Sequence, residues 1–240
     1  MIVPDWPAPG NVRSASTTRA GGVSAPPYDT FNLAEHVGDS AAAVAANRAR
    51  LQQHLDLPSS PLWLEQVHGR QVVDAATAGL RPAADASFTR QPGHVCAVMT
   101  ADCLPVLFCD RAGTAVAAAH AGWRGLAAGV LEASVEAMAV DPGQVLAWLG
   151  PAIGAQAFEV GDEVRTAFTA AHAQAVDAFV IRPNGRWLAD IYALARIRLQ
   201  AVGIGAVYGG GHCTYSEPDG FFSYRREQVT GRMASLIWLV

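Results

Sequence analysis

The fold is decided by the stretch Val95–His120, VCAVMTADCLPVLFCDRAGTAVAAAH, in which apolar runs alternate with short turns. The runs Val95–Thr100, Pro105–Cys109 and Thr114–His120 are each short and bounded by turn residues, which predicts strands. Their apolarity is nearly continuous, whereas a strand with one face in water would alternate apolar and polar residues. The stretch therefore predicts the centre of a sheet that is covered on both faces.

Elements on either side of this stretch place the sheet in a larger fold. Further strands are predicted at Val12–Thr17, Gln71–Asp74, Val145–Leu149, Phe179–Ile181 and Ala206–Gly209. Apolar residues at helical spacing predict helices at Ala41–Leu57, Leu126–Val140 and Asp162–Ala175, and from Asp190 to Gly203. Strands outnumber helices and do not alternate strictly with them, which favours an α+β fold, with a mixed sheet flanked by helices, over a doubly wound one. No repeat of fixed period and no long linker interrupts the chain, so we expect one domain, residues 1–240.

The composition limits the class of protein and its partners. Of the 240 residues, 51% are hydrophobic and 16% are charged, so the chain has ample material for a buried core. The net charge of -4 provides no basic field for nucleic acid or an anionic membrane, and we expect neither as a partner. All 17 basic residues are Arg, which excludes Schiff-base and Walker lysines but leaves bidentate recognition of phosphate. The sequence does not indicate an oligomeric state.

The distribution of apolar residues and cysteines indicates the compartment. The opening segment MIVPDWPAPG contains an acid and three prolines, where a secretory signal has a cationic and then an apolar run. The longest apolar stretch, Val95–Cys109, is interrupted by Asp102 and is shorter than the roughly 20 residues of a membrane helix. The four cysteines form no Cys-x-x-Cys pair and are typical of reduced thiols. We therefore expect a cytoplasmic protein.

Reactive side chains stand at the ends of the most apolar strands. His68 lies in QVHG, Cys103 in TADCLP and His120 in AAHAGWRG. A single buried Cys or His is usually a packed, structural residue. Taken together, two imidazoles and one thiolate would give Zn²⁺ three ligands and leave a fourth position open, as in catalytic zinc sites. A thiolate also suits copper, so copper is the alternative metal.

The segment that follows His120 has the pattern of an anion site. Gly122 and Gly125 allow a tight turn and a close approach of the backbone to a ligand. The turn leads into a predicted helix, whose first N–H groups and dipole favour negative charge, and Arg124 adds a permanent positive charge. A glycine turn with a surface Arg and a buried, hydrogen-bonded His is the structural alternative for the same residues.

Eleven motifs, in this order along the chain, carry a resemblance to a known family. They are TTRAGGVS, FNLAEHVGD, NR, QVHG, ADA, TADCLPVLF, AAAHAGWRG, LGPAIG, FEVGDEV, CT and FFSYRR, between Thr17 and Arg226. With them the chain resembles the YfiH-type family, also called laccase-domain or multicopper polyphenol oxidoreductase-like proteins and peptidoglycan editing factors. The resemblance implies an α+β fold of β-sheets layered between helices, with some likeness to bacterial toxin cysteine hydrolases.

The resemblance also implies an activity and a site. The implied activity is that of a purine nucleoside phosphorylase that takes adenosine, inosine, guanosine or methylthioadenosine with phosphate, and adenosine deaminase activity is also assigned to the family. The family's metal site falls on His68, Cys103 and His120. Substrate contacts are expected from the residues of the family motifs that suit phosphate or ribose, namely Arg19, Asn32, Arg124, Arg225 and Arg226.

Two chemistries associated with such sites find little support in the residues. A multicopper centre needs many histidines, mostly in His-x-His pairs, but the chain has 7 His and no such pair. Established zinc deaminases use His-x-Glu and Pro-Cys-x-x-Cys motifs, and the chain has neither. A deaminase built here would need another proton carrier, for which Asp102 and Glu65 are the candidates.

Two further functional hypotheses are consistent with the same residues. In one, Cys103 is a nucleophile with His68 or His120 as its base, which would give a cysteine amidase or hydrolase that edits peptidoglycan precursors. In the other, the chain is a non-catalytic module that binds a metal or a partner. Zinc content, thiol alkylation and turnover distinguish the three readings.

Overall fold

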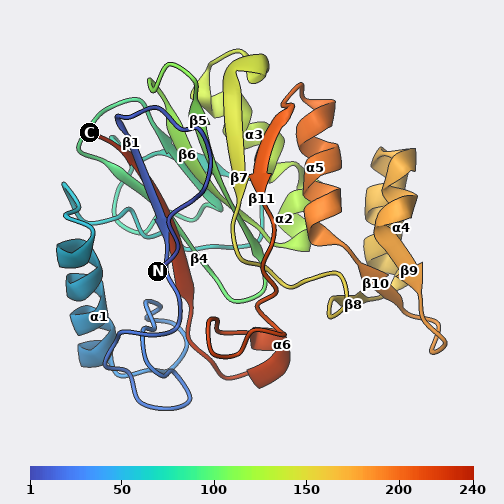
Figure 1. Cartoon of the computed structure of the whole chain (residues 1–240), viewed down its shortest axis with the longest axis horizontal. Coiled ribbons are helices and arrows are strands. Elements are labelled where there is room, and N and C mark those ends of the chain that lie inside the picture. Colours follow the sequence, from blue (N-terminus) through green and yellow to red (C-terminus); the bar gives the residue numbers. More distant parts are fainter.

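Two sheets lie face to face in the computed structural model, which describes residues 1–240 (Figure 1). The larger sheet has six strands in the order β11-β7-β5-β6-β3-β2. These are β2 (Val72–Asp74), β3 (Ala86–Thr89), β5 (Leu104–Asp110), β6 (Val116–Ala121), β7 (Val145–Leu149) and β11 (Ala206–Gly209). β5 runs antiparallel to β6 and β7, whereas β2 with β3 and β7 with β11 are parallel pairs, so the sheet is mixed.

The smaller sheet has three antiparallel strands, β1 (Val12–Ser16), β12 (Met233–Leu239) and β4 (Val95–Thr100), in that order. The last strand of the chain, β12, therefore lies between the first strand and β4. All seven residues of β12 are buried, as are all residues of β4, β5 and β6. The prediction from the continuous apolarity of Val95–His120 is thus confirmed, because the strands formed by this stretch are covered on both faces.

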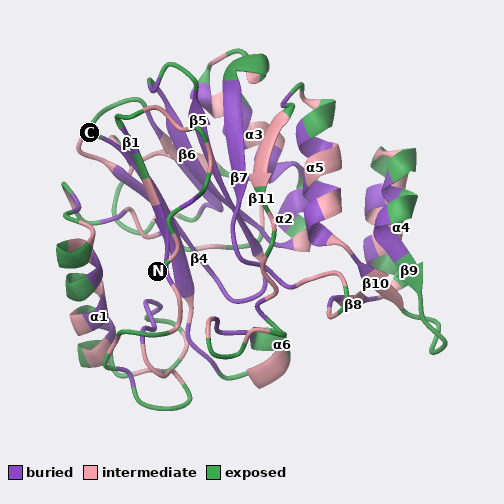
Figure 2. Cartoon of the chain, in the orientation of Figure 1, coloured by how far each residue is buried: buried purple, intermediate pink, exposed green.

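Helices cover the outer faces of the two sheets. Helix α1 (Ala41–His54) packs on the smaller sheet, and α2 (Trp123–Ala128), α3 (Val130–Met138) and α5 (Ile191–Ala201) pack on the larger one (Figure 1). The chain therefore folds as four layers: helix, sheet, sheet, helices. The buried faces of the helices point toward the sheets and their exposed faces toward solvent (Figure 2). This α+β arrangement of mixed sheets between flanking helices is the one expected from the sequence.

Three apolar clusters fill the spaces between the layers. The largest lies between the six-stranded sheet and its helices and includes Phe108, Leu131 and Phe168. A second fills the space between the two sheets, and a third, which includes Leu51 and Trp238, lies between α1 and the smaller sheet. The layers are therefore held together by apolar contact, which is non-directional and proportional to buried area.

A small third sheet lies beside the helices of the larger sheet (Figure 1). It consists of β8 (Glu159–Val160), β10 (Trp187–Ala189) and β9 (Phe179–Ile181), in that order. It is accompanied by α4 (Asp162–Ala171) and the 3₁₀ segment Ala173–Ala178, while a 3₁₀ turn, Pro142–Gln144, precedes β7 and the short helix α6 (Tyr224–Glu227) precedes β12. No helix in the chain combines the length and the apolarity needed to cross a bilayer.

The structure corrects two of the predicted helices. The single helix predicted over Leu126–Val140 is wrong, because Gly129 adopts φ +96° and divides it into α2 and α3. The helix predicted over Asp162–Ala175 is wrong in its last turn, because α4 ends at Ala171 and the chain continues as a 3₁₀ segment. The other two are confirmed within a turn, and side chains cap both: Ser40 accepts from Ala43 N, and Asp190 accepts from Tyr192 N and Ala193 N.

Candidate functional site

Three segments that are distant in sequence bring His68, Cys103 and His120 together. Cys103 lies in the turn between β4 and β5, and His120 lies near the end of β6, which pairs with the start of β5. His68 lies in the loop that leads to β2. One ligand atom from each of the three lies within 4.8 Å of the other two. The cluster therefore depends on the pairing of two central strands and on the placement of one loop.

Two side chains hold the His68 loop in place. The amide of Gln66 donates to Met99 O and accepts from Met99 N, both at 2.8 Å, and so attaches the loop to β4. The buried carboxylate of Asp85 accepts from the backbone N–H of His68 at 2.9 Å and of Gly69 at 2.6 Å. His68 itself adopts φ +60°, a conformation that costs a non-glycine residue free energy and is common at functional sites.

Asp85 also orients a second member of the cluster. Its Oδ1 lies 2.8 Å from His120 Nδ1, and both side chains are buried. A carboxylate at Nδ1 holds the Nδ1 proton and leaves Nε2 of the ring free to bind a metal, as in carboxylate–histidine–zinc arrangements. One carboxylate therefore fixes the backbone of His68 and the tautomer of His120.

The electrostatics of the cluster favour a thiolate beside an imidazolium when no metal is bound. Burial raises the pKa of Cys103, but the positive charge of His120 and hydrogen bonds from His120 and His68 outweigh it and lower that pKa to about 6. Burial lowers the pKa of His120, but the Cys103 thiolate and Asp85 raise it to about 9. Asp85 has a lowered pKa, because its bonds to His120 and Gly69 outweigh its own burial.

The three donors fit a tetrahedral Zn²⁺ ion. Typical Zn–S and Zn–N bond lengths place S and N ligand atoms about 3.5 Å apart in a tetrahedron. Cys103 Sγ lies 3.9 Å from His68 Nε2, and the rings of His68 and His120 meet edge to face with centroids 4.8 Å apart. Cys103 Sγ and His68 Nε2 would need to approach by only a few tenths of an ångström, and all three ligand atoms lie within 4.8 Å of one another. Three protein ligands would leave the fourth position of a tetrahedral ion open.

Because Gly122 has no side chain, it leaves space for the side chains of Cys103 and His68. A Cβ at this position would lie 2.9 Å from both Cys103 Sγ and His68 Cδ2. Gly122 is the residue that precedes α2, so the start of this helix lies directly against the cluster. This agrees with the close backbone approach that the glycine turn predicts.

Two cavities meet at the cluster. A polar cavity of about 330 Å³ is lined on one side by His36, Gln66 and Arg232. An apolar cavity of about 210 Å³ is lined on the other by Trp123, Arg124, Ile153, Phe158, Ile191 and Arg225. His68, Ala101, Cys103 and Tyr224 line both of them. A metal held here would therefore lie between a polar and an aromatic compartment.

Asp102 connects the cysteine to the wall of the apolar cavity. It adopts φ +87°, and its carboxylate accepts from Thr214 Oγ1 and from the backbone N–H of Arg225, both at 2.6 Å. Its backbone carbonyl accepts from Ile153 N at 2.9 Å. Because both carboxylate oxygens of Asp102 accept these bonds, Asp102 fixes the turn that carries Cys103. Glu65, the other acid considered as a proton carrier, is exposed to solvent.

The five residues expected to bind substrate fall into two groups. Arg124 and Arg225 line the apolar cavity, where Arg124 stacks on Trp123 at 4.4 Å. The side chains of the other three are bound within the protein and line neither cavity. Arg19 bonds to Asp29, Pro218 and Glu227; Arg226 bonds to Thr214, Tyr215, Phe221 and Glu227; Asn32 is fully buried. The structure thus brings only Arg124 and Arg225 to the cluster.

Sequence reasoning missed four residues of the site. Asp85, His36 and Tyr224 stand inside the motifs ADA, FNLAEHVGD and FFSYRR, so the motifs carried a signal for them. Arg232 lies outside every motif, and only the fold places it at the polar cavity.

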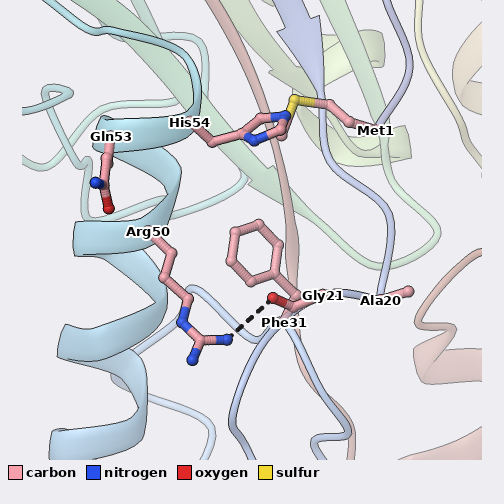
Figure 3. Close-up of a pocket in the computed structure, with 7 residues that line it drawn as sticks. All are labelled: Met1, Ala20, Gly21, Phe31, Arg50, Gln53 and His54. Carbon is pink, nitrogen blue, oxygen red and sulfur yellow. Dashed lines mark hydrogen bonds between the residues drawn. The ribbon is translucent and has the colours of Figure 1, made fainter.

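A separate cavity beside α1 lacks a metal-ligand set. It has a volume of about 450 Å³ and is lined by Met1, Ala20, Gly21, Phe31, Arg50, Gln53 and His54 (Figure 3). Arg50 donates to Gly21 O at 3.4 Å across it. No thiol or carboxylate lines it, and it shares no residue with the cluster.

Comparisons with known proteins agree with this site and fold. The family model described as multi-copper polyphenol oxidoreductase laccase matches residues 13–240. The purine nucleoside phosphorylase YfiH of Escherichia coli is 59% identical over 241 residues, which cover 100% of this chain and 99% of that protein. The purine nucleoside phosphorylase of Haemophilus influenzae is 48% identical over 241 residues, which cover 99% of this chain and 98% of that protein.

Solved structures give the same result. The crystal structure of NMB0706 from Neisseria meningitidis has a TM-score of 0.96 and 57% identity, and covers 99% of this chain and 98% of that one. The structure of YfiH from Bacillus licheniformis has a TM-score of 0.90 and 29% identity, and covers 95% of this chain and 93% of that one. With the layered fold, the cluster and these matches in agreement, the chain belongs to the multi-copper polyphenol oxidoreductase laccase family that includes YfiH.

Proposed function

We propose that this chain is a zinc-dependent purine nucleoside phosphorylase. It would convert adenosine, inosine, guanosine or methylthioadenosine and phosphate into the free base and a ribose 1-phosphate, or methylthioribose 1-phosphate in the last case. The observation that carries the proposal is the position of His68, Cys103 and His120 between a polar and an aromatic cavity. The names of the relatives as purine nucleoside phosphorylases support it.

In this reaction the bond from C1′ to the purine breaks and a bond from C1′ to a phosphate oxygen forms. The electron pair of the broken bond leaves with the purine, which takes up a proton. Zn²⁺, or copper as the alternative, would act at His68, Cys103 and His120 as a Lewis acid toward a substrate oxygen. Asp85 would keep His120 in the tautomer that binds the metal, and Asp102 would hold Cys103 against the cavity wall.

The apolar cavity has the features of a purine site. Trp123, Phe158 and Tyr224 present aromatic surface to it, and Arg124 and Arg225 present guanidinium groups that can donate to a purine. Arg19, Asn32 and Arg226 would act indirectly, since their bonds hold the loops around α6 and β12.

Product analysis tests the proposal. Zinc-loaded protein is incubated with adenosine in phosphate buffer, and the products are separated by chromatography, with Cys103→Ala as the control. Adenine with ribose 1-phosphate, absent from the control, is the expected result. Inosine as the product would mean that the site deaminates adenosine instead. If none of the four nucleosides is consumed, the nucleoside proposal fails.

A second function, cysteine amidase or hydrolase acting on peptidoglycan precursors, is favoured by one observation. The thiol of Cys103 has a pKa of about 6 and lies 3.9 Å from His68 Nε2, which is the arrangement of an activated nucleophile. The two functions differ in their response to metal. For the amidase, zinc would block both turnover and alkylation of Cys103, whereas the phosphorylase would lose activity when zinc is removed.

A further inference from the structure

The polar cavity differs from the apolar one in the charges that line it. Its lining includes Arg232 and His36 but no carboxylate. The apolar cavity contains two arginines, but Asp102 also lines it, and Arg225 Nη1 already donates to Glu159 O at 2.9 Å. A phosphate dianion placed there would face the carboxylate of Asp102 directly. No carboxylate lines the polar cavity, and Cys103 lines both cavities and so does not distinguish them.

Arg232 is held so that part of its guanidinium stays available. Nη1 donates to Thr230 O at 2.9 Å and to Gly231 O at 3.0 Å, whereas Nε and Nη2 have no partner within the protein. The backbone N–H of Arg232 donates to Asn32 Oδ1, and the guanidinium lies 5.7 Å from the centre of the Tyr224 ring. The group is therefore anchored on one side and free to bind an anion on the other.

The surroundings of the polar cavity add positive charge. Arg48 and Arg81 both pair with Glu35, next to His36. Burial, and then the charges of Arg232, Arg81 and Arg48, lower the pKa of His36. His36 is thus a neutral ring at neutral pH that can donate one N–H, beside three guanidinium groups. Such a site favours an oxyanion.

We propose that the polar cavity binds the phosphate substrate, with Arg232 as its main ligand and His36 as a second donor. This assignment rests on the proposed phosphorylase function. The purine then occupies the apolar cavity, and C1′ lies where the two cavities meet, beside Tyr224 and Cys103. Phosphate and purine would lie on opposite sides of the sugar, as displacement at C1′ requires: the phosphate oxygen bonds to C1′ as the purine departs with the electron pair.

Kinetics of three variants of the zinc-loaded full chain test the assignment. Arg232→Gln should raise the KM for phosphate by about tenfold or more and change the KM for inosine by less than about threefold, because one charge-assisted donor is lost. His36→Asn should raise the KM for phosphate by a smaller factor. Arg50→Gln, in the separate cavity of Figure 3, serves as the matched control and should leave both constants unchanged.

A second measurement keeps the two proposals separable. Binding of inorganic phosphate to the zinc-loaded protein is measured by calorimetry without nucleoside, and Arg232→Gln should weaken it by about tenfold. Unchanged phosphate binding and KM in this variant, with a raised phosphate KM in Arg124→Gln, would place phosphate in the apolar cavity and overturn the inference. Equal loss for phosphate and inosine, together with lost zinc, would show a structural role and also overturn it. If wild type binds phosphate through Arg232 but consumes no nucleoside, only the proposed function fails.

Discussion

At the scale of single residues, Asp85 holds two members of the cluster formed by His68, Cys103 and His120. Its carboxylate bonds to the backbone of His68 and Gly69 and to the ring of His120. In Asp85→Asn the amide cannot accept all of these bonds, so the affinity for Zn²⁺ should fall by about 10- to 100-fold. Competition with a chromophoric chelator measures this. Asp74→Asn, at a carboxylate that bonds to Ala76 N, is the control, and equal affinities in the two variants would contradict the role given to Asp85.

The pKa values of the cluster predict how zinc affinity depends on pH. Between about pH 6 and about pH 9 the metal-free site holds a Cys103 thiolate and a His120 imidazolium. Zinc needs the neutral ring, so each ion bound releases one proton and the apparent association constant should rise about tenfold per pH unit in this window. The rise should stop above about pH 9 and become steeper below about pH 6, where the thiol must also lose its proton. Chelator titrations across the window measure the slope, and a flat profile would refute the ion pair.

The sequence identified the three donors of the cluster but not the residues around them. His68, Cys103 and His120 are conspicuous because reactive side chains stand where apolar strands end. Asp85 lies in the ADA motif but not where an apolar strand ends, and Arg232 lies outside every motif. Their roles arise from pairing between β3 and β6 and from the position of β12 beside α1, contacts that link residues far apart in the chain.

At the scale of elements, the start of α2 lies directly against the His68–Cys103–His120 cluster. Gly122→Ala would place a Cβ 2.9 Å from Cys103 Sγ and from His68 Cδ2, so at least one of these ligands must move. We expect zinc affinity to fall by about tenfold or more, with the fold retained. Gly205→Ala, where a Cβ meets nothing within 4 Å, is the control. Bound zinc, measured by elemental analysis after dialysis, should be reduced only in Gly122→Ala.

Gly129, which separates α2 from α3, allows the effect of a substitution on stability to be predicted. In a continuous helix, Gly129→Ala would stabilise the protein by about 1 kcal/mol. Because Gly129 has φ +96°, the substitution should instead lower the free energy of unfolding by about 1 kcal/mol. Denaturant unfolding measures the difference, and a rise in stability would show that α2 and α3 form one helix in solution. Helical spacing of apolar residues continues across this glycine, which is why the sequence predicted a single helix.

The strands show where sequence patterns succeed and where they fail. β4, β5 and β6 were predicted because continuous apolar runs bounded by turns have few other interpretations. Four strands were not predicted: β3 (Ala86–Thr89), β8 (Glu159–Val160), β10 (Trp187–Ala189) and β12 (Met233–Leu239). β3 and β8 are short and mix polar with apolar residues, so their extended form comes from pairing with β6 and β10 rather than from their own composition. β12 is a seven-residue, mostly apolar run, and the prediction overlooked this signal.

At the scale of the whole molecule, stability depends on the C-terminal strand. Deletion of residues 233–240 removes β12 and leaves β1 and β4 without a partner, with apolar faces of two clusters exposed. We expect this chain to be unfolded or aggregated by circular dichroism and gel filtration. Deletion of Val240 alone, which is 58% exposed, should give a folded protein. A cooperative thermal transition in the longer deletion would contradict the central role of β12.

The place of β12 between β1 and β4 also has a consequence for biosynthesis. A ribosome makes β1 and β4 well before β12, so the smaller sheet cannot close until residues 233–239 have left the exit tunnel. Until then the nascent chain holds two apolar strand edges that only these residues can cover. Arg232 directly precedes β12, so the polar cavity is also completed only when this part of the chain has emerged.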